Sequence, residues 1–257
     1  MDDVQIAFAQ LNSFFDHIYV VSLHRATDRH EHLQKELAGL KYEIFWGKDK
    51  NEFDVEQLKK ENIYNEEIAI KRHRYNKKMI AGVIGCSWSH RLIYEDVLKN
   101  NYGKVLILED DIVIDVQTIS VLDRILTELP KDWELFYLGF ALNEPPIKAT
   151  IKKWYYHFVR LFGATKLSHK EIANRLPKKI STHVYKAGYH DCTHAYAITN
   201  SCAKKLVELQ TPLVFCSDHL LAYASTNEII RSYVTMPKTI NQVYQVTEIP
   251  THSYINH

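Results

Sequence analysis

The sequence lacks the features that membrane-spanning and secreted proteins need. No apolar run among its 257 residues approaches the roughly 20 residues with which a helix crosses a bilayer. The first ten residues, MDDVQIAFAQ, carry two acids where a secretory signal carries positive charge. The last five, SYINH, are not an ER-retention signal. A soluble or surface-attached cytoplasmic protein is therefore expected.

Cysteine, glycine and proline are also scarce. The four cysteines are far apart and lack the C-x-x-C spacing of zinc and redox sites, so reduced thiols are expected. They are Cys86, Cys192, Cys202 and Cys216. Eight glycines, seven prolines and the absence of any Ser- or Pro-rich tract give no sign of a disordered linker. A single domain over residues 1–257 is expected.

The charge of the chain is nearly balanced. With 32 basic and 31 acidic residues, the sequence does not belong to the strongly basic class of nucleic-acid-binding proteins, and no nucleic-acid partner is expected. Charge is nevertheless clustered. A basic run, KRHRYNKK at 71–78, faces either a diphosphate or a negatively charged acceptor, or it is a solvated loop.

Residues 148–179 form a second basic segment, with nine Lys or Arg residues against one acid. Within it, IKKWYYHFVRLF sets large apolar side chains at helical spacing. These are Ile151, Trp154, Tyr155, Phe158 and Phe162. One interpretation is an interfacial helix on an anionic membrane, where each basic group contributes about 1 kcal/mol. The other is a helical insertion whose aromatic side chains pack against the protein while its basic face is solvated.

Strand and helix patterns alternate from residue 17 to about 140. Apolar β-branched runs predict strands, and apolar side chains at i, i+3 and i+4 predict helices. The predicted strands are 17–23, 42–47, the run before residue 109, and 133–140. The predicted helices are 30–40, 54–63, a helix after the glycine-containing loop at 82–90 that Gly103 caps, and 118–129. This alternation predicts an α/β domain whose mostly parallel central sheet is covered by helices on both faces.

Three consecutive acids follow the buried run VLIL in GKVLILEDDIVIDV: Glu109, Asp110 and Asp111. In open α/β sheets, ligands bind beyond the carboxyl ends of the strands. Adjacent carboxylates repel one another there unless a cation or several donors offset the repulsion. Mg²⁺ and Mn²⁺ prefer such oxygen ligands. The alternative is that the acids cap the next turn or pair with basic residues.

Four segments in this order resemble glycosyltransferase family 25: HIYVVSLHRATDR, GVIGCSWSHRLIYEDV, LILEDDIVI and HAYAITNSCAKKL. Bacterial members build the oligosaccharide of lipopolysaccharide, and animal relatives put galactose on collagen hydroxylysine. The resemblance covers roughly residues 18–206, with weaker echoes at SDHLL and VYQV. It implies a GT-A-like, Rossmann-like fold, a nucleotide-sugar donor that is commonly UDP-galactose, and Mn²⁺ or Mg²⁺ at the acidic motif. The expected parts are a nucleotide-sugar-binding half at 17–140, the basic insertion at 148–179, and an acceptor-side half at 183–245.

The resemblance also assigns residues to the donor. Asp111 would be the best metal ligand, while Asp110 and Glu109 would ligate the metal, bind ribose, or orient a metal-bound water. Further donor-binding residues follow from the first two motifs: Val21, Ser22 and Leu23 near the uracil and ribose, and Arg25 and Arg29 near the diphosphate. The alternative for the arginines is an ordinary solvated helix start.

The motif GCSWSH matches the family's Gly-Cys-x-x-Ser-His segment. Ser89 and His90 are expected to begin or precede a helix, and to donate to the donor sugar or to hold the loop under the metal site. A lone histidine is otherwise more often structural. Trp88 is expected to serve packing, and Cys86 to be a small buried residue.

Glycosyl transfer with inversion also needs a carboxylate that takes the proton of the acceptor hydroxyl. Asp218 in CSDHLL is the leading candidate, and its alternative role is a helix N-cap. Asp191 and His194, in YHDCTHAY, are the next candidates. The commoner family pattern at this point is Gly-Thr-His, and this chain has Cys192 in place of the glycine, before Thr193. Late metal ligands in such enzymes are often histidines, but His252 and His257 lie in the C-terminal tail and are weak candidates.

The expected function is metal-dependent transfer of a hexose, galactose from UDP-galactose, to a glycan or lipid-linked glycan of a bacterial surface, such as lipopolysaccharide or lipooligosaccharide. The enzyme would be cytoplasmic, with peripheral contact to the inner face of the anionic cytoplasmic membrane. One alternative is a nucleotide-sugar-binding or scaffold protein without catalysis on the same fold. A haloacid-dehalogenase-like phosphatase fits less well, because Glu109 stands where that class has its nucleophilic aspartate.

Overall fold

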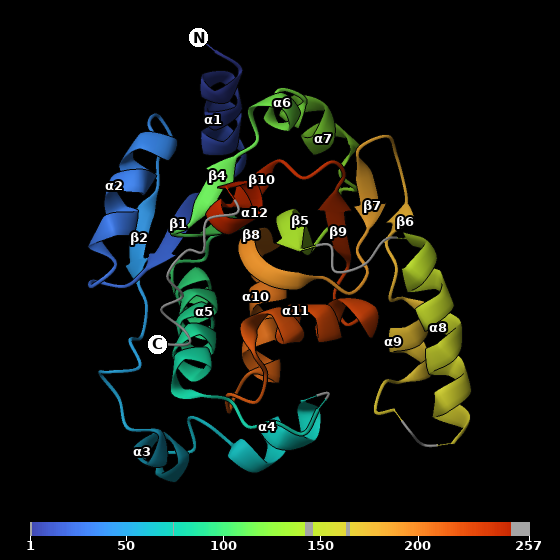
Figure 1. Cartoon of the computed structure of the whole chain (residues 1–257). Helices are drawn as coiled ribbons and strands as arrows, with labels where there is room; N and C mark the ends of the chain where they lie inside the picture. Colours follow the sequence, from blue (N-terminus) through green and yellow to red (C-terminus); the bar gives the residue numbers. More distant parts are fainter. Residues whose placement is uncertain (1, 74, 142–145, 163–164, 248–257) are drawn as a thin grey trace.

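A computed structural model of the chain (Figure 1) describes residues 2–73, 75–141, 146–162 and 165–247. Within them, eight strands form one sheet, and six of the eight run in the same direction. In sheet order they are β2 (Glu43–Trp46), β1 (His17–Ser22), β3 (Lys104–Glu109), β8 (Asp191–Thr199), β5 (Leu135–Ala141), β9 (Ser232–Thr235), β7 (Val184–Lys186) and β6 (Lys178–Lys179). Only β8 and β7 run against the others.

Helices cover both faces of this sheet (Figure 1). One face packs against α1 (Asp3–Phe14), α2 (Thr27–Glu36), α6 (Val116–Ile119) and α7 (Leu122–Glu128). The other face packs against α5 (Ala81–Lys99), α10 (Asn200–Leu209) and α11 (Ser217–Thr226). The peripheral helices are α3 (Val55–Lys60), α4 (Glu66–Arg72), α8 (Pro146–Leu161) and α9 (His169–Ala173), while α12 (Val243–Thr247) lies near the middle of the molecule (Figure 1). The predicted α/β architecture with a mostly parallel sheet is confirmed.

Strand β3 lies near the centre of the sheet and fixes the position of the acids. Leu106 and Leu108 point into the core under α1 and α2, while Val105 and Ile107 point toward α5 and α10. Burying each such side chain stabilises the fold by about 1.5–3 kcal/mol. A register slip of one residue would exchange the two faces of the strand. The packing therefore holds Glu109 at the end of β3.

The prediction of a glycine-containing loop at 82–90 is wrong, because α5 is helical from Ala81 onward. The glycines there permit close packing within a helix. A β-carbon at Gly85 would collide with the backbone carbonyl oxygen of Lys48. The cap expected at Gly103 is also wrong. The helix ends at Asn100, and Asn101 takes the left-handed conformation with φ of 55°.

Smaller differences concern element boundaries. The helix expected at 118–129 is divided into α6 and α7, and the helix expected at 30–40 begins at Thr27 and ends at Glu36. Neither α1 nor α4 was predicted. Among the described helices, none combines the length and the apolar character that crossing a bilayer requires. The division into a donor half, an insertion and an acceptor half stays a prediction.

Candidate active site

The three acids lie where β3 ends and the chain turns into the short strand β4 (Ile112–Ile114). Glu109 is opposite Val21 of the parallel strand β1, so β1 and β3 end at the same edge. Strand β10 (Ile240–Gln242) pairs with β4, and the Val243 amide donates to the Asp111 carbonyl across 2.8 Å. The acidic turn is thus enclosed by the first strand and the last part of the described chain.

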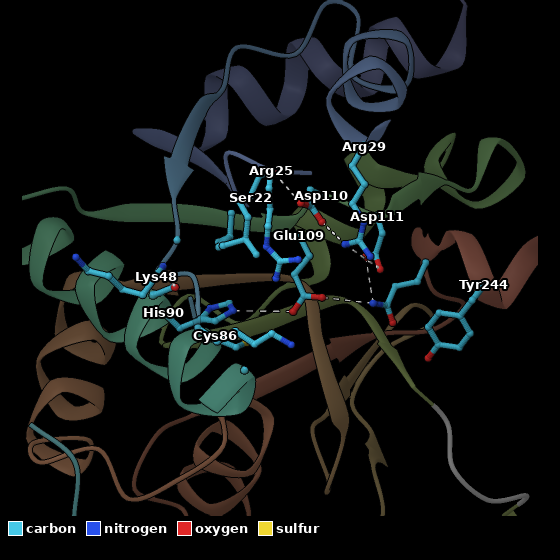
Figure 2. A pocket seen from close by; sticks show the side chains of 17 residues that line it. Ser22, Arg25, Arg29, Lys48, Cys86, His90, Glu109, Asp110, Asp111 and Tyr244 are labelled. Carbon is cyan, nitrogen blue, oxygen red and sulfur yellow. Dashed lines mark hydrogen bonds and ion pairs between the residues drawn. The ribbon is translucent and has the colours of Figure 1, made fainter. Parts of the chain in front are cut away.

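A cavity of about 440 Å³ opens at this edge (Figure 2), within the usual size range of small-molecule sites. All ten residues that the sequence assigned to the donor or the metal line it: Val21, Ser22, Leu23, Arg25, Arg29, Ser89, His90, Glu109, Asp110 and Asp111. They come from β1 and the loop after it, from α2, from the middle of α5 and from the end of β3. Three stretches that are distant in sequence, 21–29, 89–90 and 109–111, therefore converge on one cavity.

Glu109 and Asp111 are two half-buried carboxylates. Burial raises the pKa of Glu109 well above its usual range, and the charge of Asp111 adds to this effect. Burial also raises the pKa of Asp111, although the nearby Arg29 guanidinium opposes the shift. Neutral donors supply part of the compensation. The Thr193 hydroxyl donates to Glu109 across 2.6 Å, and the Gln242 amide donates to both carboxylates, across 3.4 and 3.2 Å.

Asp110 has different partners from its two neighbours. Its Oδ2 accepts a hydrogen bond of 2.6 Å from the Ser22 hydroxyl, and its Oδ1 accepts from Arg29 Nη1. The same Arg29 nitrogen lies 3.7 Å from Asp111 Oδ2. Arg25 pairs instead with the buried Asp49. Both arginines are therefore held at the cavity by carboxylates, and Asp110 serves to position Ser22 and Arg29.

Ser89 and His90 lie in the middle of α5, so the expectation that they begin or precede a helix is wrong. The Ser89 hydroxyl donates to the Gly85 carbonyl across 2.7 Å and accepts from the Lys48 amide across 2.8 Å. His90 Nδ1 lies 2.7 Å from the Tyr196 hydroxyl, and its Nε2 lies 3.9 Å from Glu109 Oε1. Burial lowers the pKa of His90 to about 4, so the ring is neutral near neutral pH.

Asp191 and Asp218, two of the expected catalytic residues, lie outside the lining of this cavity but close to each other. Asp191 begins β8 and Asp218 lies in the first turn of α11. Together with His219 they form a cluster in which one ligand atom of each lies within 4.8 Å of the others, close enough to hold a metal ion. Asp218 is not the N-cap of α11, because Cys216 occupies that position.

His194, the third expected catalytic residue, is fully buried. Its Nε2 lies 3.3 Å from the Ile240 carbonyl oxygen, and burial lowers its pKa to about 4. The structure brings it neither to the cavity lining nor to the Asp191–Asp218–His219 cluster. His252 and His257 lie outside the described residues.

Several cavity residues were not found from the sequence. They are Gly47, Lys48, Lys50, Gly82, Cys86, Gln242 and Tyr244. Cys86 is half-buried and lines the cavity, so the expectation of a buried packing residue is wrong. For Tyr244 the weak family echo VYQV, at 243–246, was the available signal, and Gln242 lies just before it. Lys48 and Lys50 belong to none of the sequence motifs described above.

The donor set at the cavity fits a hard divalent cation. Glu109 and Asp111 are half-buried, and loss of water raises the pKa of both, with the neighbouring negative charge adding to the effect. A cation between or beside them would remove that repulsion, and oxygen ligands are those that Mg²⁺ and Mn²⁺ prefer. The adjacent Arg25 and Arg29 add positive charge for an anionic ligand.

Carboxylates and guanidinium groups that meet at the carboxyl end of a central strand define an α/β protein with a site for an anionic ligand. In sequence, residues 15–221 match the family model described as "Glycosyltransferase family 25 (LPS biosynthesis protein)". The chain belongs to this family.

Two curated relatives show how much of the chain is matched. The chain is 30% identical to mouse procollagen galactosyltransferase 2 over 131 residues, 49% of this chain and 21% of that protein. It is 24% identical over 206 residues to the probable inactive glycosyltransferase 25 family member 3 of cattle, covering 76% of this chain and 29% of that protein. The chain thus spans less than a third of the length of these relatives.

Among solved structures, the chain is similar to mouse xyloside xylosyltransferase 1 in its apo form. The TM-score is 0.40 at 11% sequence identity, and the match covers 90% of this chain and 85% of the other.

Proposed function

We propose that the chain is a metal-dependent glycosyltransferase that moves a hexose, galactose from UDP-galactose, with inversion onto a surface glycan such as lipopolysaccharide or lipooligosaccharide. The observation that carries this proposal is the convergence of Glu109, Asp111, Arg25 and Arg29 on one cavity. A sugar diphosphate has both chemistries that such a site serves, because its phosphates attract guanidinium groups and divalent cations alike.

In this proposal the donor lies along the ends of β1 and β3. Backbone groups of Val21 to Leu23 would meet the uracil and ribose, and Arg25 and Arg29 would bind the diphosphate. Lys48, which was not found from the sequence, also lines the cavity, but its ammonium points away from the acids (Figure 2) and lies 5.0 Å from the centre of the Trp88 ring, so it adds no charge beside the diphosphate. Because Asp110 already accepts from Ser22 and Arg29, its role would be to hold both donors in place.

Glu109 and Asp111 would hold Mn²⁺ or Mg²⁺. When bound, the cation would neutralise the charge that develops on the diphosphate leaving group. This assignment changes the order expected from the sequence, in which Asp110 ranked above Glu109 as a ligand. The reason is that the charged Arg29 and the Ser22 hydroxyl already occupy both oxygens of Asp110, whereas the donors to Glu109 are the neutral Thr193 and Gln242, and Gln242 also donates to Asp111.

The transfer step requires a base for the acceptor hydroxyl. The acceptor oxygen would form a bond to C1 of the sugar, and the bond from C1 to the phosphate oxygen would break with its electron pair leaving on UDP. The acceptor proton would pass to the Asp218 carboxylate, beside Asp191. His194 is not retained for this role, because it is fully buried and outside the cluster.

One alternative is a protein that binds a nucleotide sugar without transferring it. The relatives supply the observation that favours it, since one of them is named a probable inactive family member. Such a protein would share the donor cavity but would show no turnover, so binding and turnover need separate measurements.

The direct test is release of UDP from UDP-galactose in the presence of Mn²⁺, with wild-type protein, Asp111→Asn and the matched control Asp123→Asn on α7. We expect Asp111→Asn to lower turnover by about 100-fold or more, because the leaving-group charge loses its stabilisation. The exposed Asp123 lies outside the donor cavity, so its variant should match wild type.

Undiminished turnover in Asp111→Asn would contradict the cation assignment. Binding of UDP-galactose without turnover in wild type would favour the non-catalytic alternative. A thermal-shift screen of nucleotide sugars with and without Mn²⁺ identifies the donor, since a bound ligand stabilises the folded state in proportion to its affinity. Indifference to every nucleotide sugar would contradict the proposal as a whole.

A further inference from the structure

A second cavity, of about 320 Å³, lies between α4, α9 and α11. It shares no lining residue with the donor cavity. Its lining is basic and aromatic: Lys71, Arg72, Lys166, Leu167, Ser168, Glu171, Tyr189, Phe215, His219, Tyr223 and Asn227. The basic run at 71–78, which the sequence left without a ligand, thus contributes Lys71 and Arg72 to a cavity other than the donor cavity.

The first turn of α11 separates the two cavities. On the donor side, Ser217 Oγ lies 3.4 Å from the sulfur of Cys86, which lines the donor cavity. On the other side, His219 lines the second cavity. Asp218, the proposed base, lies between Ser217 and His219 in sequence and in the same cluster as His219. A ligand in the second cavity would therefore lie beside the proposed base, and a sugar attached to that ligand would extend past Asp218 toward the donor.

The chemistry of the second cavity selects a negatively charged ligand. The Arg72 guanidinium lies 5.3 Å from the centre of the Phe215 ring and 5.1 Å from that of Tyr223, which gives a cation seated on an aromatic wall. Lys166 Nζ donates to the Lys71 and His73 carbonyl oxygens, across 3.0 and 3.3 Å, and to Asn76 Oδ1, so its charge adds to that of Arg72 while Arg72 is the cation that meets the ligand. Glu171 is the lone acid of the lining, and its carboxylate accepts from the Ser168 amide across 2.7 Å.

We propose that this cavity binds the acceptor as a sugar that carries a carboxylate or a phosphate. Aromatic walls with a few placed polar groups suit a compact polar ring, and the excess of cations selects the acidic substituent. The acceptor role rests on the proposed function, whereas the binding of an anionic sugar does not. The two can fail independently.

The test measures binding of four probes by calorimetry: methyl glucuronide, glucose 6-phosphate, and their neutral counterparts methyl glucoside and glucose. We expect at least one anionic probe to bind about tenfold or more tightly than its neutral counterpart, because a charge-assisted hydrogen bond contributes about 1.5–3 kcal/mol. Arg72→Gln should abolish this preference. Arg124→Gln, an exposed arginine on α7, is the matched control and should retain it.

Stabilisation by UDP-galactose with Mn²⁺ is measured in the same variants and should be unchanged by Arg72→Gln. Equal binding of neutral and anionic probes, no binding of any probe, or an undiminished preference in Arg72→Gln would each overturn the proposal. If the anionic probe binds and no nucleotide sugar does, the cavity assignment stands and the proposed function fails. The affinity for methyl glucuronide, compared with that for glucose 6-phosphate, identifies whether the cavity binds a carboxylate or a phosphate.

A different observation, on α8, supports a second inference. Six large apolar side chains on this helix and just after it are between 59% and 76% exposed. They are Ile151, Trp154, Tyr155, Phe158, Leu161 and Phe162. The interpretation that these aromatics pack against the protein is therefore wrong. Figure 1 shows α8 at the outer edge of the molecule.

The side of α8 that faces the protein is polar. The Tyr156 ring lies 5.2 Å from the Arg175 guanidinium, the His157 ring stacks on His169 at 6.2 Å, and Arg160 donates to the Leu167 carbonyl. A helix on a globular protein ordinarily turns its apolar face to the core. This helix does the reverse, so its apolar face needs another partner.

We infer that this face of α8 docks on a bilayer that contains anionic lipids. The charge of the segment favours that occupant over a second copy of the chain, since residues 148–179 carry nine basic residues against one acid and would repel themselves. Exposed Lys170, Lys178 and Lys179 belong to the same segment. Aromatic side chains flanked by basic ones are typical of helices that lie in the membrane interface.

Co-sedimentation with vesicles tests the inference, using phosphatidylcholine alone and phosphatidylcholine mixed with phosphatidylglycerol. We expect binding to the mixed vesicles that weakens with salt, and a loss of about tenfold or more when Trp154→Ser is combined with Phe158→Ser. Val116→Ser, at an exposed apolar position on α6, is the control and should bind like wild type. Circular dichroism checks that the variants remain folded.

Equal binding to both kinds of vesicle, or binding that survives the double substitution, would overturn the membrane assignment. Absence of vesicle binding together with a dimer that the double variant loses would assign the face to a second copy instead.

Discussion

The side-chain amide of Gln242 donates a hydrogen bond to Asp111 across 3.2 Å. The two residues are 131 positions apart, and the pairing of β10 with β4 brings them together. The same amide lies 3.4 Å from Glu109 Oε2, so one neutral donor serves two half-buried carboxylates. Gln242 thus offsets part of the repulsion that a cation would otherwise remove.

Replacing Gln242 by leucine should therefore destabilise the metal-free protein. We expect a loss of about 1–3 kcal/mol in the free energy of unfolding, because buried acceptors lose their donor. Urea unfolding in EDTA measures it. Added Mn²⁺ should recover more stability in Gln242→Leu than in wild type. An equal response of both proteins to Mn²⁺ would show that the cation binds away from these carboxylates.

Replacing Glu109 by glutamine should stabilise the metal-free protein, increasingly so at higher pH. The pKa of Glu109 is raised above its ordinary value of 4.5, so over this pH range the folded state holds a proton that the unfolded state has lost. Wild-type stability therefore falls as pH rises from about 4.5 through the raised pKa, while Glu109→Gln avoids this fall. Unfolding of both proteins across pH, with exposed Glu52→Gln as control, measures the difference.

Two groups of side chains could bind a cation, and substitutions separate them. If Glu109 and Asp111 hold it, Asp111→Asn should weaken Mn²⁺ binding by about 100-fold, whereas His219→Asn should leave it within a few-fold of wild type. Calorimetric titration with Mn²⁺, without nucleotide sugar, measures both. The opposite ranking would move the cation to the Asp191–Asp218–His219 cluster.

The residues found from the sequence are those that belong to continuous motifs. A buried strand that ends in acids, and a first strand followed by arginines, each fix several cavity residues through local geometry. Glu109 and Val21 then meet because β1 and β3 are neighbours. The ranking of the three acids as metal ligands could not be predicted, because it depends on which of them accept hydrogen bonds from Ser22, Arg29 and Gln242.

Contacts between distant segments account for what was missed. Gln242 enters through the pairing of β10 with β4, for which one sequence carries no register information. The glycines before His90 indicated a loop, but at Gly85 the backbone of the Lys48 loop packs directly on the helix. His219 escaped notice because its partners Asp191 and Asp218 lie on two different elements.

The protein should be less stable with Cys192 than with glycine at this position. Its φ is 71°, in the left-handed region that a β-carbon disfavours by about 1–2 kcal/mol. In this conformation its amide points to Asp218 Oδ2, 3.5 Å away. The family pattern with glycine here has a physical basis in that geometry. We expect the free energy of unfolding of Cys192→Gly to exceed that of Cys192→Ala by about 1 kcal/mol. Both variants lack the thiol, and they differ only in the β-carbon. Equal stability would contradict this account.

Asp218 should control the rate of transfer and leave donor binding intact. A general base contributes about 10²–10⁴-fold to the rate of proton transfer, so Asp218→Asn should lower kcat by a factor in that range. The KM for the donor should stay near the wild-type value, since Asp218 does not line the donor cavity. Asp191→Asn is the matched comparison, because Asp191 belongs to the same cluster. A larger loss in Asp191→Asn than in Asp218→Asn would assign the proton to Asp191, and a change confined to the donor KM would show that neither aspartate is the base.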